Sequence, residues 1–158
     1  MFREMRRKKN ELDVREAKKL LAEARIGILA VNGDDGYPYA IPVNYYYDEA
    51  DQKIYFHGSR AGHKADALKN CDKICFTVFG PEVVKEEAWA PYVKSAVVFG
   101  RCHPVGDPAA SGASLRKFAM KYYPDEALMN EEISRSGKAV QMYEIEMEHI
   151  SGKEIQER

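Results

Sequence analysis

A glycine-rich segment in the middle of the chain carries residue types that bind phosphate groups. It reads GSRAGHK at positions 58–64, and we call it the phosphate segment. Gly58 and Gly62 let the backbone approach a ligand closely, Ser59 offers a hydroxyl, and Lys64 offers a positive charge. The segment follows a strand-like run and precedes a helical pattern, and the first N–H groups of a helix are unpaired and positively polarised. This composition favours a phosphate monoester.

A plainer interpretation of the same residues is an ordinary helix capped by Ser59, with Lys64 on its surface. The segment is not a GxxxxGK[ST] loop, because its second glycine is not followed directly by lysine and Ala65 is neither Ser nor Thr. No GxGxxG motif follows a predicted strand either, which excludes the common dinucleotide-binding pattern. The choice between the two interpretations depends on the strand that comes before.

That strand, YPYAIPVNYYY at positions 37–47, has large or shaped groups on both faces. By the two-residue period, one face carries Tyr39, Ile41, Val43, Tyr45 and Tyr47, and the other carries Ala40, Pro42, Asn44 and Tyr46. Prolines cannot donate ladder hydrogen bonds, so Pro38 and Pro42 indicate an edge, a bulge or a bend.

A flavin ring needs an apolar surface and hydrogen bonds along one edge. The residues that could supply both form the shelf segment, Pro42, Val43, Asn44 and Tyr45, in which Asn44 offers a donor and an acceptor. For Tyr39 and Tyr47 we expect core packing. The adjacency of the shelf and phosphate segments predicts a site for flavin mononucleotide (FMN).

His57 joins the two segments and is the candidate catalytic residue. Histidine titrates near neutral pH, so His57 could donate a proton near the ring or contact the ribityl phosphate. A strand-end histidine bonded to a backbone carbonyl is an equal alternative. We expect His63 to be exposed and His103 and His149 to be structural or surface residues. Ser59 lacks an elbow motif and an orienting acid, so no triad emerges.

The overall composition narrows the class of protein. The chain has 158 residues, 45% hydrophobic and 31% charged, with a net charge of -1. A near-neutral charge argues against a dedicated nucleic-acid binder. The three cysteines form no disulfide framework, and we expect no metal at Cys71 and Cys75. No secretory signal or membrane-spanning run is visible, so we expect no membrane contact and a cytoplasmic protein.

The order of patterns predicts a mainly β domain spanning residues 1–158, with a solvated basic arm at residues 1–12. Helices are predicted from Asp13, where Asp13 and Glu16 have capping-box spacing, around 59–70, over 114–123 and over 125–136. About six strands lie between them, and the last carries Tyr143, Ile145 and Met147 on one face and glutamates on the other. Positive-φ turns are predicted at Asn32-Gly33 and Asp35-Gly36. Bent strands of this kind indicate a small antiparallel barrel.

Several motifs, in this order along nearly the whole chain, resemble the nitroimidazole-resistance family of pyridoxamine 5′-phosphate oxidase-like FMN-binding split barrels. They are RRK, GILAVNG, YPYAIPVNYYYD, IYFHGSRAGHK, ICFTV, VVFGRC and ISGKE. The resemblance implies a six-stranded antiparallel split β-barrel and a homodimer with FMN at the subunit interface. By motif match, Pro42, Val43, Asn44 and Tyr45 would flank the ring, and His57, Gly58, Ser59 and Lys64 would hold the ribityl phosphate.

The family also has a Tyr-x-Ser-Val segment that enters the site from the partner. Here it reads Tyr92-Val-Lys-Ser95-Ala-Val, one residue longer between Tyr and Ser, so Ser95 is the candidate partner-side residue. Trp89 could reach the flavin from the partner or pack on its own barrel. Pyridoxamine 5′-phosphate oxidases carry a further C-terminal segment rich in Arg and Trp. This chain lacks it, and we do not expect that activity.

The sequence is compatible with three functions. The first is an FMN-dependent oxidoreductase that takes electrons from a nicotinamide nucleotide and reduces a small acceptor, for example a nitroaromatic. The second is a flavin-binding or redox-sensing module without efficient turnover. The third is a haem-binding split barrel, with His57 or His63 as the ligand. The phosphate segment favours a flavin over haem, since it suits a phosphate.

Overall fold

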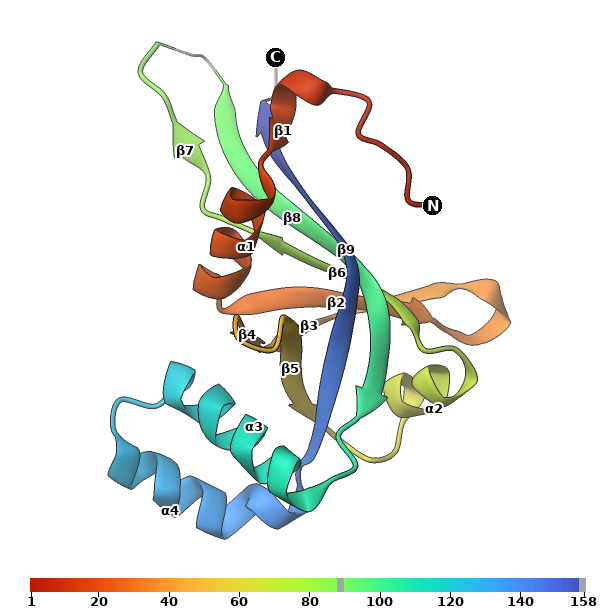
Figure 1. The fold of residues 1–158 in the computed structure, drawn as a ribbon, viewed down its shortest axis with the longest axis vertical. Coiled ribbons are helices and arrows are strands. Elements are labelled where there is room, and N and C mark those ends of the chain that lie inside the picture. The colour runs from red at the N-terminus through yellow and green to blue at the C-terminus, as the bar shows by residue number, and fades with distance from the viewer. Residues whose placement is uncertain (88–89, 157–158) are drawn as a thin grey trace.

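The computed structural model describes residues 1–87 and 90–156, and these form one antiparallel sheet curled into a half-barrel with helices packed around it (Figure 1). The strands are β1 (Glu11–Leu12), β2 (Ile26–Asn32), β3 (Pro38–Asn44), β4 (Tyr46–Asp48), β5 (Lys53–Gly58), β6 (Lys73–Phe79), β7 (Val83–Val84), β8 (Pro91–Pro104) and β9 (Gln141–Gln156). The helices are α1 (Val14–Glu23), α2 (His63–Asn70), α3 (Pro108–Tyr122) and α4 (Glu126–Ser136), with short 3-10 turns at Lys8–Asn10, Asp34–Gly36 and Gly137–Ala139.

The main path through the sheet runs β3-β2-β6-β8-β9-β5-β4, and β1 and β7 add short pairings to β9 and β8. β3 and β4 are one bent strand, separated only at Tyr45. Its first half pairs with β2 and its second half with β5, so the two ends of the sheet path are covalently joined. The predicted six-stranded split barrel is therefore confirmed, with β3 and β4 counted as one strand and β3 as the edge that its prolines indicate.

Close packing at the start of β2 explains why residue 27 is glycine. A Cβ at this position would lie 2.1 Å from the ring of Phe76, so only glycine leaves room for the Phe76 ring beside β2. Phe76 is fully buried and meets the Tyr45 ring edge-on at 5.0 Å. The core therefore extends from β6 to the bend between β3 and β4.

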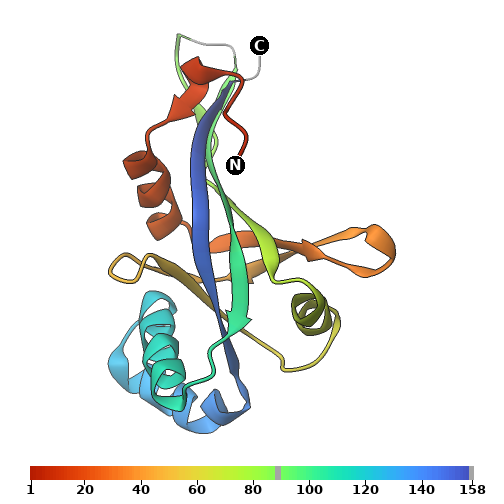
Figure 2. The same ribbon diagram turned by 45° about the vertical axis from the view of Figure 1, so that its right-hand side comes forward.

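The longest strands, β8 and β9, run side by side along most of the long axis of the molecule (Figure 2). On β9 the predicted alternation holds, because Tyr143 and Ile145 are buried while Glu146 and Glu148 are exposed. The pairing of β8 with β9 shifts register between Phe99 and Gly100. An irregularity of this kind bends the strand and increases its twist locally.

Helix boundaries agree with the predictions in part. Asp13 caps α1 by accepting a hydrogen bond from the Glu16 amide, but the Glu16 side chain pairs with Lys94 instead of completing the capping box. α3 begins at Pro108, earlier than predicted, because Asp107 caps it through the Ala110 amide. α4 spans Glu126–Ser136, close to the predicted range.

Two other expectations change. Positive φ occurs at Asp35 and Gly36, as predicted, but Gly33 is extended with φ -83°, since Asn32 simply ends β2. The arm is also less free than expected, because β1 pairs with β9 and Phe2 stacks on His149 at 4.8 Å between centroids. Its basic side chains are exposed. None of the described helices is both long and apolar enough to cross a bilayer.

Candidate functional site

The phosphate segment is a tight connection between β5 and α2. Gly62 is the N-cap of α2 with φ 109°, a conformation that favours glycine, and no side chain caps the helix there. Ser59 Oγ accepts a hydrogen bond from the Ala61 amide, 3.2 Å away, so Ser59 is not the cap. The plainer interpretation of a Ser59-capped helix is therefore wrong. The uncapped first turn of α2 keeps the anion-binding character of a helix N-terminus.

Lys64 is a half-buried cation without a carboxylate partner within 4 Å among residues 1–87 and 90–156. Its Nζ lies 5.1 Å from the Phe56 ring centroid and 5.8 Å from that of Tyr143. Burial lowers its pKa from the ordinary value. Gly58 makes room for this side chain, because a Cβ there would lie 2.6 Å from Lys64 Nζ. An anion at this position would relieve the desolvation of the Lys64 charge.

A tyrosine that the sequence did not single out fixes the loop. Tyr143 on β9 donates a hydrogen bond from its hydroxyl to the Ser59 carbonyl at 2.7 Å. Its ring stacks on Phe56 with centroids 5.2 Å apart, which orients the hydroxyl toward the loop. No motif marks Tyr143, because its sequence pattern is that of any inward-facing strand residue.

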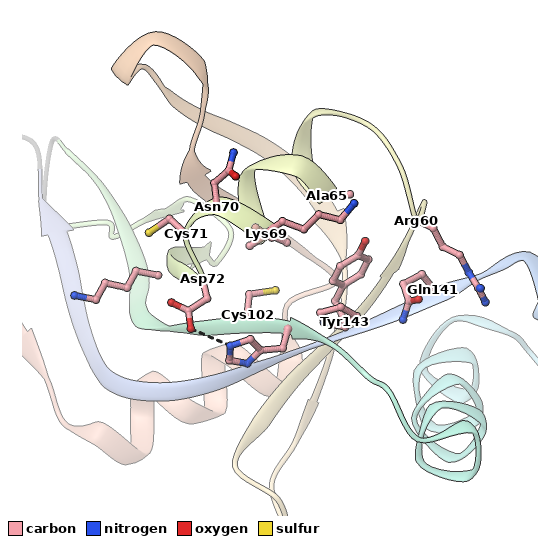
Figure 3. Close-up of a pocket in the computed structure, with 13 residues that line it drawn as sticks. Arg60, Ala65, Lys69, Asn70, Cys71, Asp72, Cys102, Gln141 and Tyr143 are labelled. Atoms are coloured by element: carbon pink, nitrogen blue, oxygen red, sulfur yellow. Dashed lines mark hydrogen bonds and ion pairs between the residues drawn. The ribbon is translucent and has the colours of Figure 1, made fainter.

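A pocket of about 780 Å³ adjoins the phosphate segment on the side of α2, β8 and β9 (Figure 3). Arg60 and Tyr143 line it, as do Lys69 and Lys73. Its one acid, Asp72, accepts hydrogen bonds from Arg101 Nη1 at 2.9 and 3.1 Å and bonds His103 Nε2 at 2.9 Å. Those two partners lower the pKa of Asp72. The pocket therefore contains one ionised carboxylate, already paired with Arg101 and His103, and several cations.

Cys102 also lines this pocket, but burial raises the pKa of its thiol to about 12. A protonated, buried thiol is a poor nucleophile and metal ligand. Among the described residues, no group of three or more His, Cys, Asp and Glu side chains is placed to hold a metal ion.

His57 faces away from the phosphate segment, although it is its sequence neighbour. Its ring meets Phe118 of α3 edge-on at 5.0 Å, whereas Gly58, on the other face of β5, contacts Lys64. His57 lines a small pocket of about 170 Å³ with apolar residues of α3 and α4. Desolvation, and then the Lys64 charge, lower the pKa of His57. The imidazole is therefore neutral at pH 7.

The shelf segment is divided between the two faces of the bent strand. Pro42 and Asn44 are exposed, Val43 packs partly on the core, and Tyr45 is fully buried. The Tyr45 hydroxyl donates to the Leu21 carbonyl, so its ring is a core element and not a free surface. The Asn44 Nδ2 donates to the Arg25 carbonyl at 3.0 Å. As expected, Tyr47 is buried and Tyr39 packs against the core.

Helix α3 connects the two segments through a chain of aromatic contacts. His57 packs on Phe118, and Phe118 lies 5.0 Å from Tyr122 between ring centroids. The Tyr122 hydroxyl accepts from the Tyr45 amide at 2.9 Å and is 2.6 Å from the Tyr45 carbonyl. Both Phe118 and Tyr122 lie on the face of α3 that makes these contacts. No sequence motif indicates that this face brings the end of β5 to the end of β3.

Ser95 does not join this group within one chain. It lies on β8 opposite Phe79 and Lys153, seven residues before Cys102, which corresponds to roughly 23 Å along a strand. His63 is exposed, as expected, but stacks on Tyr39 at 4.0 Å and lies 3.7 Å from Asp34. Trp89 lies outside the described residues.

Comparison with known proteins places the chain in a family. The family described as "Pyridoxamine 5'-phosphate oxidase" matches residues 13–154. The chain belongs to this family. Among curated proteins, no sequence matches the chain. The family match covers every residue of the shelf and phosphate segments, together with α3 and Ser95.

Solved structures agree on the fold. A candidate 5-nitroimidazole antibiotic resistance protein from Bacteroides thetaiotaomicron is 18% identical, with a TM-score of 0.77 over 92% of this chain and 87% of that chain. A FAD-binding protein from Mesorhizobium loti is 23% identical, with a TM-score of 0.65 over 92% and 96%. A FAD binding protein from Mycobacterium smegmatis is 15% identical, with a TM-score of 0.69 over 94% and 99%.

Proposed function

We propose that the chain binds FMN and works as a flavin-dependent oxidoreductase. Electrons come from a nicotinamide nucleotide and pass to a small acceptor such as a nitroaromatic. The observation that carries the proposal is the phosphate segment, where the half-buried Lys64 has no carboxylate partner in the described structure and lies beside the uncapped start of α2. The names of the relatives support a flavin, since two of the solved structures are FAD-binding proteins.

The residues of the phosphate segment fit the phosphate end of FMN. Gly58 and Gly62 shape the loop, the Ser59 hydroxyl has its proton free to donate because its oxygen accepts from Ala61, and Lys64 supplies the charge. Arg60 lies between Ser59 and Lys64 in the sequence and is exposed, but no motif marks it as a site residue. Charge-assisted hydrogen bonds of this kind are roughly twice as strong as neutral ones.

The shelf segment then receives the ring, with different parts for its members. Pro42 and Asn44 offer the exposed surface and a side-chain amide, Val43 offers backbone groups on the edge strand, and Tyr45 holds the bend from inside. The bound flavin would supply the electron-transfer chemistry, while the protein supplies orientation and electrostatics. His57 at the end of β5 is neutral and exposed, so as the proposed proton donor it would first take up a proton from solvent and then pass it to the acceptor.

We further propose a homodimer with the flavin between subunits. In the described structure no strand of the same chain covers the outer edge of β3, and β2 and β6 lie between β3 and β8, which carries Ser95. In a two-fold dimer, Ser95 of the second copy can cover this edge. Sedimentation of the FMN-loaded protein as a monomer would exclude this arrangement.

The absorbance spectrum of the purified protein is the first test. A flavin spectrum, or quenching of FMN fluorescence on titration with the protein, supports the site. Stopped-flow mixing with NADH and with NADPH then tests the reaction, and a nitroaromatic acceptor should reoxidise the reduced protein. Flavin binding without reduction by either nucleotide would reduce the proposal to a flavin-binding or redox-sensing module. No flavin binding at all would overturn it.

A further inference from the structure

Two cations meet at the end of the shelf segment. Arg25 lies between α1 and β2, and Lys121 lies in the last turn of α3. Arg25 Cζ lies 4.8 Å from the ring centroid of Tyr122, and Lys121 Nζ lies 4.2 Å from that of Tyr45 and 5.6 Å from that of Tyr122. Arg25 also donates to the Lys121 carbonyl at 3.4 Å. The folded chain therefore brings together two positive charges separated by 96 positions.

Neither cation has a carboxylate within 4 Å in the part of the chain that the structure describes. Lys121 donates to the Ala24 carbonyl, which satisfies one of its protons but not its charge. Lys117, one turn earlier on α3, is the contrast, because it pairs directly with Asp48. Burial, and then the Arg25 charge, lower the pKa of Lys121 to about 8. The fold thus keeps a like-charge pair without a counter-ion.

This pair lies behind the exposed end of β3. Asn44 bonds the Arg25 carbonyl at 3.0 Å, and the Tyr122 hydroxyl lies 2.7 Å from the same carbonyl. Asn44 is exposed, belongs to the edge strand and shares the Arg25 carbonyl with Tyr122, so this carbonyl links a ligand position on β3 to the two cations. Positive charge in this place would attract negative charge on that ligand.

We propose that Arg25 and Lys121 are positioning residues that stabilise the negatively charged edge of the reduced flavin next to Asn44. This inference rests on the proposed function. A flavin that takes up two electrons and one proton carries one negative charge, spread over its pyrimidine edge. Charge close to that edge tunes the electronics of the cofactor. Since oxidised flavin has no such charge, the two cations favour the reduced form over the oxidised form.

The test is the midpoint potential of bound FMN, measured by dithionite titration against a reference dye. Lys121→Gln removes the charge but keeps an N–H donor for the Ala24 carbonyl. Arg25→Gln removes the charge at an exposed position and keeps an N–H donor for the Lys121 carbonyl. Each variant should bind reduced FMN about tenfold more weakly relative to oxidised FMN, which lowers the potential by about 30 mV. Lys121→Arg should restore it. Lys19→Gln, an exposed lysine on α1 that pairs with Glu23, controls for net charge.

The outcomes separate the inference from the proposed function. If the wild-type protein binds FMN and both glutamine variants keep its potential, the cations serve only the fold, and the inference is overturned while the flavin site stands. If the wild-type protein binds no flavin, both fall. Circular dichroism checks that the Lys121 variants fold, and the exposed Arg25 keeps the test decisive if they do not.

Discussion

The phosphate segment and the shelf segment form the two halves of the proposed site, and they are built in different ways. The phosphate segment is local, since β5, the loop and the start of α2 lie within a few positions of one another. The shelf segment is local in sequence but depends on distant partners, because Tyr45 is held by Leu21 of α1 and Tyr122 of α3. The phosphate segment needs one distant side-chain contact, from the Tyr143 hydroxyl to the Ser59 carbonyl, whereas the shelf segment depends on the packing of two helices.

Because the two segments are built differently, residues that affect binding are expected to differ from residues that affect stability. Lys64 and Ser59 face the proposed phosphate position and contribute little to the core. Replacing them should therefore lower the affinity for FMN and leave the fold intact. Tyr45 and Tyr122 hold the bend between β3 and β4, so replacing them should change the fold and, through it, the site. Variants of these residues test this division.

The largest effect is expected for Tyr45→Ala. The side chain is fully buried, packs on Phe76 and bonds the Leu21 carbonyl. Losing a large core aromatic costs about 3–5 kcal/mol of the free energy of unfolding, measured by urea titration. Tyr45→Phe is the matched control and should cost only about 1 kcal/mol for the lost hydrogen bond. A mild effect of Tyr45→Ala would mean that the bend is held elsewhere.

The next effect belongs to the phosphate segment. Lys64→Ala removes a charge-assisted phosphate contact worth roughly 1.5–3 kcal/mol, so the Kd for FMN should rise about tenfold or more in a fluorescence titration. The free energy of unfolding without FMN should not fall, because a desolvated cation is removed. Lys19→Ala provides the surface control. Unchanged FMN affinity in Lys64→Ala would mean that the phosphate lies elsewhere.

This contrast also explains what the sequence could predict. The β5–α2 junction could be read directly, because glycines, a hydroxyl and a lysine at close spacing specify a local geometry. The alternation of the shelf strand put Tyr45 on the same face as Tyr39 and Tyr47, but Tyr45 was predicted to flank the flavin and is instead fully buried. The orientation of His57 toward α3 and the meeting of Arg25 with Lys121 depend on tertiary packing across 61 and 96 positions. Such contacts leave no local pattern.

A smaller effect is expected for Tyr122→Phe. The hydroxyl contacts the amide and carbonyl of Tyr45 and the Arg25 carbonyl, all on one side of the bend. Its loss leaves the Tyr45 amide without that acceptor and should cost about 1–2 kcal/mol of unfolding free energy. FMN affinity should fall as well, because the shelf segment loses its anchor on α3. A stability loss without any change in affinity would separate the shelf from the binding site.

The smallest effect is a pH dependence that originates in Lys121. Its folded pKa of about 8 lies below the ordinary 10.5, so between these values the unfolded chain binds a proton that the folded chain does not. Stability therefore rises with pH in this window. Between pH 8 and 9.5, below the titration of tyrosines, the gain should be about 1 kcal/mol or less because the site is half exposed. Lys121→Gln should abolish this gain in urea titrations. An identical rise of the unfolding free energy in the variant would mean that another group titrates in this range. Lys121 would then not be a charge held without a counter-ion.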